Sequence, residues 1–126
     1  MKSMLDTLAD KLAEVPALSN IAIHYFQRPE SLSESDSSIV LIPLAPPQQE
    51  TFGSDNFLQK RFSYQVNVES SDYYETKRIA HEVEKVFLEA AFYQNTGGLD
   101  EYFEETKRYV DARTYRGSSS VYDIEY

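Results

Sequence analysis

Residues 61–91 read RFSYQVNVESSDYYETKRIAHEVEKVFLEAA, and the hydrophobic period of this stretch changes once along its length. Over residues 62–68 every second position is apolar or aromatic, which predicts a strand with one buried face. Asp72 and Glu75 then have the spacing of a capping box, and the apolar residues after them recur on one helical face. The stretch therefore predicts a long strand, beginning near Phe57, that runs directly into an amphipathic helix.

Upstream of this stretch, the pattern predicts a further helix and two shorter strands. Apolar residues recur at helical spacing from Met4 to Val15, and Pro16 ends that helix because proline cannot donate the next backbone hydrogen bond. β-Branched and aromatic residues crowd segments 21–26 and 39–44, which predicts strands there. The polar segments that follow these two strands are rich in turn residues and are predicted to be surface loops, 30–38 and 45–56.

The segment downstream of the second helix is less regular. The run Asn-Thr-Gly-Gly at residues 95–98 predicts a turn. The spacing over residues 99–110 permits a helix, but Tyr, Val and Thr crowd residues 105–116 and favour a strand that ends at Gly117. Residues 118–126 are then expected to form a flexible C-terminal tail.

The order of these elements, α-β-β-β-α-β, predicts the fold class. We expect an α+β protein with a mainly antiparallel sheet of about four strands and two helices packed on one face. A chain of 126 residues is long enough for one hydrophobic core, so residues 1–117 are expected to form a single domain.

Composition disfavours several classes of protein. The chain carries 21 acidic and 12 basic residues, a formal net charge of −9, which disfavours binding to nucleic acid and to anionic membranes. There is no cysteine, so disulfides and thiolate chemistry are excluded. The acidic N-terminal segment does not resemble a signal peptide, and no apolar run approaches the roughly 20 residues of a membrane span.

No motif in the sequence indicates catalysis. The two histidines, His24 and His81, have no third ligand at metal-binding spacing, and His81 with Glu84 is only a weak candidate pair. The chain has four glycines and contains no phosphate-binding loop and no nucleophile elbow. Exposed acids are expected to solvate the surface, and four arginines are expected to form cross-strand or intersubunit ion pairs: Arg61, Arg108, Arg113 and Arg116. We predict no catalytic site, no cofactor and no metal.

Several local phrases occur in a suggestive order. A strand after the N-terminal helix ends in the phrase aromatic-x-Arg-Pro at residues 26–29, and the apolar strand Ile39–Leu44 follows it. The long strand and acidic-capped helix come next, and then the segment LDEYFEETKRYVDARTYRG at residues 99–117. In this order the chain resembles the tail-terminator proteins of long-tailed phages, also called minor tail, tail-completion or head-tail joining proteins. The last segment is also similar to small neck and tail proteins from phages of Gram-positive bacteria.

The resemblance implies a structural protein of the virion, made in the host cytoplasm and located in the tail or neck. Members of that family assemble into a ring, commonly a hexamer, that ends tail-tube polymerisation and gives the head connector a docking surface. The implied partners are copies of the chain itself, the tail-tube protein and the head-tail connector protein. The ring contact is expected at sheet edges and tyrosine-rich strand faces, with these candidate residues: Tyr64, Tyr109, Tyr115, Arg113 and Arg116. Loops 30–38 and 45–56 are expected to face the tail or the connector.

Three other functions remain open from the sequence. A head-completion or connector protein would form the neighbouring ring of the neck. A small α+β ligand-binding or enzymatic domain would need a pocket with convergent polar groups. An acidic mimic of DNA is the third alternative, although the acids lie beside Lys and Arg and do not form a phosphate-like row.

Overall fold

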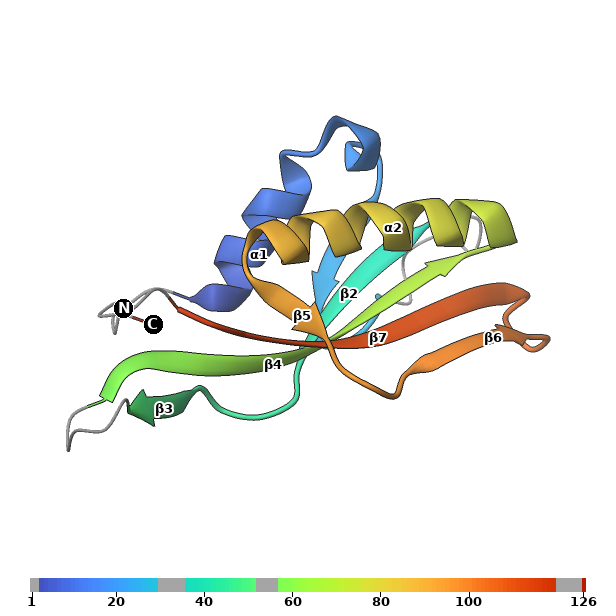
Figure 1. Cartoon of the computed structure of the whole chain (residues 1–126). Helices are drawn as coiled ribbons and strands as arrows, with labels where there is room; N and C mark the ends of the chain where they lie inside the picture. Colours follow the sequence, from blue (N-terminus) through green and yellow to red (C-terminus); the bar gives the residue numbers. More distant parts are fainter. Residues whose placement is uncertain (1–2, 30–35, 52–56, 120–125) are drawn as a thin grey trace.

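The computed structural model describes residues 3–29, 36–51, 57–119 and 126. The chain forms two helices and seven strands, with four strands after the first helix and three after the second (Figure 1). The helices are α1 (Met4–Ala13) and α2 (Tyr73–Glu89), with a short 3₁₀ turn at Pro16–Leu18. The strands are β1 (Ala22–Tyr25), β2 (Ser38–Pro43), β3 (Gln48–Thr51), β4 (Phe57–Ser70), β5 (Phe92–Gln94), β6 (Leu99–Phe103) and β7 (Arg108–Ser118).

All the strands join one mixed sheet. Its main path runs β1-β2-β4-β7-β5, and β3 and β6 pair with the free halves of β4 and β7 respectively. The β1–β2 pair is parallel, and the remaining pairs are antiparallel. The α+β class holds, but the prediction of about four strands in a mainly antiparallel sheet is wrong, because the sheet has seven strands and one parallel pair.

The three unpredicted strands depend on pairing with a neighbouring strand. β3 reads QQET, which has no apolar alternation, and it lies inside the segment predicted as the loop 45–56. β5 has only three residues, and β6 exposes all five of its side chains. Each of these strands forms because a longer neighbour, β4 or β7, offers it a hydrogen-bonding edge. Strand β7 confirms the choice of a strand over most of residues 105–116.

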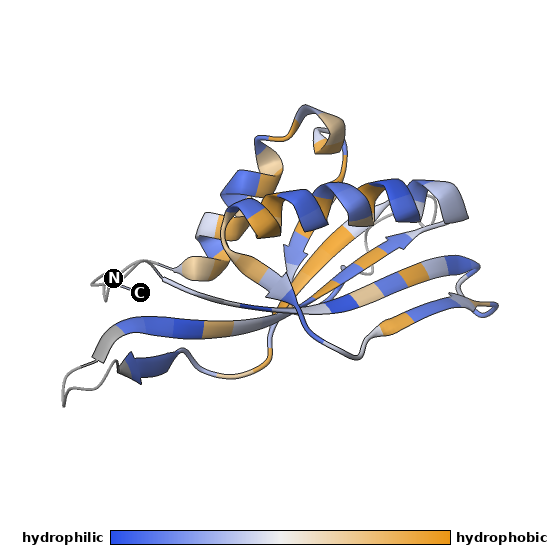
Figure 2. Ribbon diagram, viewed as in Figure 1, coloured by the Kyte–Doolittle hydropathy of each residue, from blue (hydrophilic) through white to orange (hydrophobic). Residues whose placement is uncertain are grey.

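Both helices lie on the same face of the sheet (Figure 1). Each begins with a side-chain cap: Ser3 accepts a hydrogen bond from the backbone of Asp6, and Asp72 accepts one from Glu75 at 2.9 Å. Figure 2 shows the apolar residues concentrated in β2 and on the sides of the helices that face the sheet, whereas β3 is hydrophilic. The core of the protein therefore fills the space between the helices and one sheet face.

Aromatic rings fill the centre of this core. The ring centroid of Phe87 in α2 lies 4.6 Å from that of Tyr115 and 5.8 Å from that of Phe92. Gly117 is required beneath Phe92, because a Cβ atom at residue 117 would lie 2.5 Å from the Phe92 ring. The glycine predicted to end the strand thus lies inside β7 and makes room for the core.

The domain division at residue 117 stays a prediction. Ser118 belongs to β7, and the backbone of Ser119 donates a hydrogen bond to the carbonyl of Lys60. Residues 120–125, and parts of the loops expected to face a partner, lie outside the described residues. Among the described residues, no helix is long and apolar enough to cross a membrane.

Candidate interaction surfaces

A buried ion cluster occupies the helix-covered side of β7. The carboxylate of Asp111, only 3% exposed, accepts hydrogen bonds from Lys77 at 2.9 Å and from Arg113 at 2.8 Å. Lys77 also reaches Asp100 of β6 at 2.6 Å. Burial alone would lower the pKa of Lys77, but its hydrogen bonds to Asp100 and Asp111 outweigh burial and raise the pKa.

This cluster joins three elements. Lys77 belongs to α2, Asp111 and Arg113 to β7, and Asp100 to β6. Arg113 continues toward α2, where its guanidinium lies 3.5 Å from Glu84. Every charge in the cluster faces an opposite charge of the same chain, so the cluster holds the β6–β7 hairpin against the helix and leaves little charge for a partner.

Tyrosines form an exposed cluster where β6 and β7 extend beyond the start of α2. The ring of Tyr109 lies 4.7 Å from that of Tyr102 and 5.7 Å from that of Tyr73, and Tyr73 meets Tyr74 edge-on at 5.4 Å. Tyr74 is 79% exposed and Tyr102 is 46% exposed. Large, rigid rings with polar tips are typical of protein interfaces.

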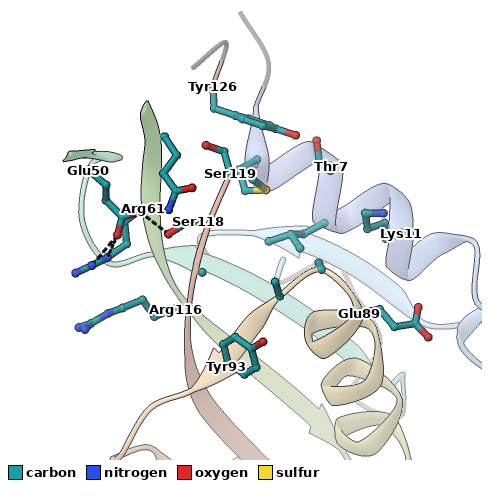
Figure 3. A pocket seen from close by; sticks show the side chains of 16 residues that line it. Thr7, Lys11, Glu50, Arg61, Glu89, Tyr93, Arg116, Ser118, Ser119 and Tyr126 are labelled. Atoms are coloured by element: carbon teal, nitrogen blue, oxygen red, sulfur yellow. Dashed lines mark hydrogen bonds and ion pairs between the residues drawn. The ribbon is translucent and has the colours of Figure 1, made fainter. Parts of the chain in front are cut away.

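A polar network lines the opposite end of the sheet (Figure 3). Glu50 of β3 accepts hydrogen bonds from Arg61 at 2.7 Å, from Gln59 at 2.6 Å and from Ser118 at 2.8 Å. Burial alone would raise the pKa of Glu50, but these three donors outweigh burial and lower the pKa. The network fastens the short strand β3 to β4 and β7.

Beside this network lies an open pocket of about 780 Å³, walled by α1, the end of α2 and the last residues of β7. Figure 3 shows that Arg61 and Arg116 point to the same side, whereas Lys11 and Glu89 project from the helices. The side chain of Arg116 is exposed and makes no hydrogen bond or ion pair with any described residue. Its neighbour Tyr93 is 62% exposed. Among the residues that the structure describes, the pocket gathers no reactive set of groups, and two of its cations, Arg116 and Lys11, have no ion-pair partner.

The sheet face away from the helices carries a shallow groove of about 520 Å³. Polar side chains of β4 form one wall, where Gln65 donates to Asn67 at 2.8 Å. Leu99 and Phe103 of β6 form the other wall, beside the turn that joins β6 to β7. Within that turn, and on the adjacent strand, Glu101, Glu104 and Glu105 are exposed and have no ion-pair partner among residues 3–29, 36–51, 57–119 and 126.

Two arginines hold the start of β2 in place. Arg108 and Arg28 both donate hydrogen bonds to the backbone carbonyl of Asp36, at 3.0 and 3.1 Å. Arg108 is 3% exposed and lies 3.8 Å from the carboxylate of Glu69. Burial raises the pKa of Glu69, and the charge of Arg28 opposes that rise. The expectation of cross-strand ion pairs is confirmed for Arg61 with Glu50 and for Arg108 with Glu69.

The five residues predicted for a ring contact lie in four places. Tyr64 and Tyr115 are in the core, and burial raises the pKa of Tyr64 to about 12. Arg113 belongs to the ion cluster and Tyr109 to the tyrosine cluster. Of the five, Arg116 alone is exposed: it lies near the end of β7 on the face away from the helices, where the earlier residues Arg108, Val110 and Ala112 are buried.

The residues that the sequence did not single out are Glu50, Lys77, Asp111 and the exposed ring of Tyr93. The first three acquire their partners only when β3 and β6 pair with β4 and β7 and when α2 packs on the sheet. A signal for the tyrosine cluster did exist, since Tyr73, Tyr74, Tyr102 and Tyr109 stand beside charged residues outside the apolar pattern.

The histidines are far from any metal geometry. The Nδ1 atom of His81 lies 4.0 Å from Glu84, and His24 is in β1. No group of three potential ligands occurs among the residues that the structure describes.

Comparison with known proteins gives one informative result. No protein family model matches the chain. No curated protein matches it either. Among solved structures, a chain of the virion of a native gene transfer agent (GTA) particle has the same fold, with a TM-score of 0.65. The alignment covers 92% of this chain and 93% of that chain at 11% sequence identity, so the likeness is one of fold.

Proposed function

We propose that this chain is a structural protein of a phage-like virion that assembles with copies of itself into a ring at the head-proximal end of a tail. The observation that carries the proposal is the shared fold over nearly the full length of both chains, one of which belongs to a gene transfer agent virion. The expected ring is a hexamer that ends tail-tube polymerisation and provides the docking surface for the head connector.

The surfaces of the protein support an assembly role. Exposed aromatic rings gather at the β6–β7 hairpin, and a further one stands beside Arg116. Strands β3, β5 and β6 each have one edge that pairs with no described strand, and such edges are natural sites of contact between subunits. The proposal includes no catalytic step, because the charged groups of the described residues are paired for structure or stand alone on the surface.

Tail morphology tests the proposal. Particles produced without this chain are expected to have tails longer than those of the wild type, because nothing then ends polymerisation of the tube. Electron microscopy of negatively stained particles measures tail length directly. Tails of normal length without heads would favour the neighbouring connector position, and normal intact particles would contradict a structural role in the tail or neck.

Oligomeric state is the second measurement. Size-exclusion chromatography with light scattering, across concentration and with the tail-tube protein added, is expected to show a closed ring. A particle that stays monomeric under all these conditions would contradict self-assembly.

A further inference from the structure

One face of the sheet carries unpaired charges of opposite sign at its two ends. The residues of β7 that face away from the helices run from Arg108 to Arg116 at every second position. On the same face, β6 places Glu101 opposite Val110, and the turn beyond it adds Glu104 and Glu105. The acidic hairpin is therefore at one end of this face, and Arg116 is at the other.

The two ends lie too far apart to neutralise each other within one chain. Arg108 marks the base of the hairpin, and Arg116 lies eight positions further along the strand, a distance of roughly 26 Å. Between them lie neutral side chains such as Thr114, Gln65 and Asn67, and the ion pair of Arg108 with Glu69 stands next to the hairpin. Neither end has a counter-charge among the residues that the structure describes, so each is open to a charged group of another molecule.

We propose that the β6–β7 hairpin of one copy docks on the Arg61–Arg116 end of the next copy, in a head-to-tail contact that propagates around the ring. This inference rests on the proposed function, since it names the surfaces by which the ring closes. The occupant of each end is a second copy of this chain, because the two surfaces are complementary in charge and belong to the same sheet face.

Side chains at both ends suit such a contact. On this face the hairpin presents Phe103, which is 37% exposed, and the receiving end presents Tyr93 beside Arg116. Tyrosine and arginine are the residues most enriched at the energetic centres of interfaces. Contacts between two different patches generate rings when the rotation closes, whereas contacts of a patch with itself generate pairs.

Net charge makes the contact testable with salt. A chain of formal charge −9 repels its copies, so screening should strengthen any association that rests on apolar burial alone. A contact between the acidic hairpin and Arg116 is attractive, and screening should weaken it. We expect the assembly to dissociate as the salt concentration increases from about 0.05 to about 0.5 M, because the Debye length then falls roughly threefold.

Charge reversal at either end provides the main experiment. Arg116→Glu is expected to raise the concentration needed for half-assembly by about tenfold or more, because it places like charges in contact. The pair Glu104→Arg and Glu105→Arg is expected to do the same from the other side. Light scattering across concentration measures both. Lys85→Glu on α2 and Glu14→Arg after α1 reverse charges elsewhere on the surface and are expected to leave assembly unchanged.

Mixing the two reversed proteins separates a head-to-tail contact from other geometries. Neither variant should assemble alone, but the hairpin of each now complements the receiving end of the other. The mixture is expected to form alternating rings with an even number of subunits, which native mass spectrometry would resolve after mixing chains of distinguishable mass. A closed pair as the largest species would overturn the head-to-tail arrangement.

The outcomes also separate this inference from the proposed function. If wild-type rings form and both reversed variants form them equally well, the contact is wrong and the ring function stands. If particles lacking the chain have normal tails and heads, the ring function fails whatever the reversals do. If the wild type does not associate at any concentration or salt, the contact is overturned as well. Circular dichroism and thermal unfolding of each variant confirm that the exposed substitutions leave the fold intact.

Discussion

The two faces of β7 differ in how their charged side chains are paired. On the helix-covered face, Asp111 is buried between Lys77 and Arg113 and each charge has a partner within the chain. On the other face, Arg116 is exposed without a partner among the described residues, and the acids of the adjacent hairpin are likewise unpaired. On this outward face Arg108 is itself buried beside Glu69, so the strand presents charge to a neighbour at its Arg116 end and uses its other charges to hold the protomer together. Single substitutions on the two faces should therefore differ in whether they change folding or assembly.

Removing the shared carboxylate of the buried face should have the largest effect on folding. We expect Asp111→Ala to lower the free energy of unfolding by about 3 kcal/mol, because it leaves Lys77 and Arg113 without their common counter-ion. That value is at the low end for buried pairs, since these two side chains remain 28% and 24% exposed. Urea denaturation measures the change.

The matched control for Asp111→Ala is Glu14→Ala, at an exposed position after α1, where the change should stay within about 0.5 kcal/mol. If both substitutions lowered the free energy of unfolding equally, the buried carboxylate of Asp111 would have no special role in stability.

Two adjacent glycines test how the hairpin is attached. Gly98 has a φ of +112°, and a Cβ atom there would lie 2.3 Å from the carbonyl oxygen of Ala112. Gly98→Ala should therefore lower the free energy of unfolding by about 2 kcal/mol, or release β6 from β7. Gly97→Ala, at φ +99° with open space around it, should lower it by about 1 kcal/mol from backbone strain alone.

Amide hydrogen exchange in β6 distinguishes local release of the hairpin from global destabilisation. Protection should fall in β6 before it falls in β4 if Gly98→Ala detaches the hairpin. If Gly97→Ala and Gly98→Ala lowered the free energy of unfolding equally, the close approach of Gly98 to Ala112 would be unimportant.

The tyrosine cluster should contribute less to folding. A double-mutant cycle on Tyr102 and Tyr109, whose rings lie 4.7 Å apart, is expected to give a coupling energy of about 1 kcal/mol. Tyr102 and Tyr74 form the control pair, because no ring contact joins them. Thermal or urea unfolding of the single and double variants gives the coupling, and a value near zero would indicate that the rings serve only a partner.

The smallest expected effect is the pH dependence that Glu50 contributes. Its pKa is lowered in the folded protein, so its stabilisation is present above the unfolded value near 4.5 and is lost as pH falls through the folded value. Glu50→Gln should remove this part of the fall in stability at low pH. At neutral pH it should lower the free energy of unfolding by less than about 1 kcal/mol. Unfolding curves between pH 3 and 7 test it, and a fall at low pH identical to that of the wild type would contradict the role assigned to Glu50.

Prediction from sequence worked where the reason for a structure lies in nearby residues. Strand β4 depends on the alternation of apolar residues, and helix α2 depends on the local hydrogen bond of its cap, Asp72. Both form as expected. Prediction failed for β3, because the polar segment QQET is a strand only through its pairing with β4. Tyr64 and Tyr115 show the same limit, since nothing in their spacing distinguishes a ring packed under α2 from one facing a partner.

Local pattern was sufficient for the two helices, the four strongest strands, the acidic surface and the absence of thiol chemistry, because each depends on residue type and short-range spacing. Pairing between elements selected the parallel β1–β2 contact, the three added edge strands and the partners of Asp111 and Glu50. Among the described residues it also left the side chain of Arg116 without a partner at one end of the open face. A charge becomes structural or available only when the folded chain determines what lies within a few ångströms of it.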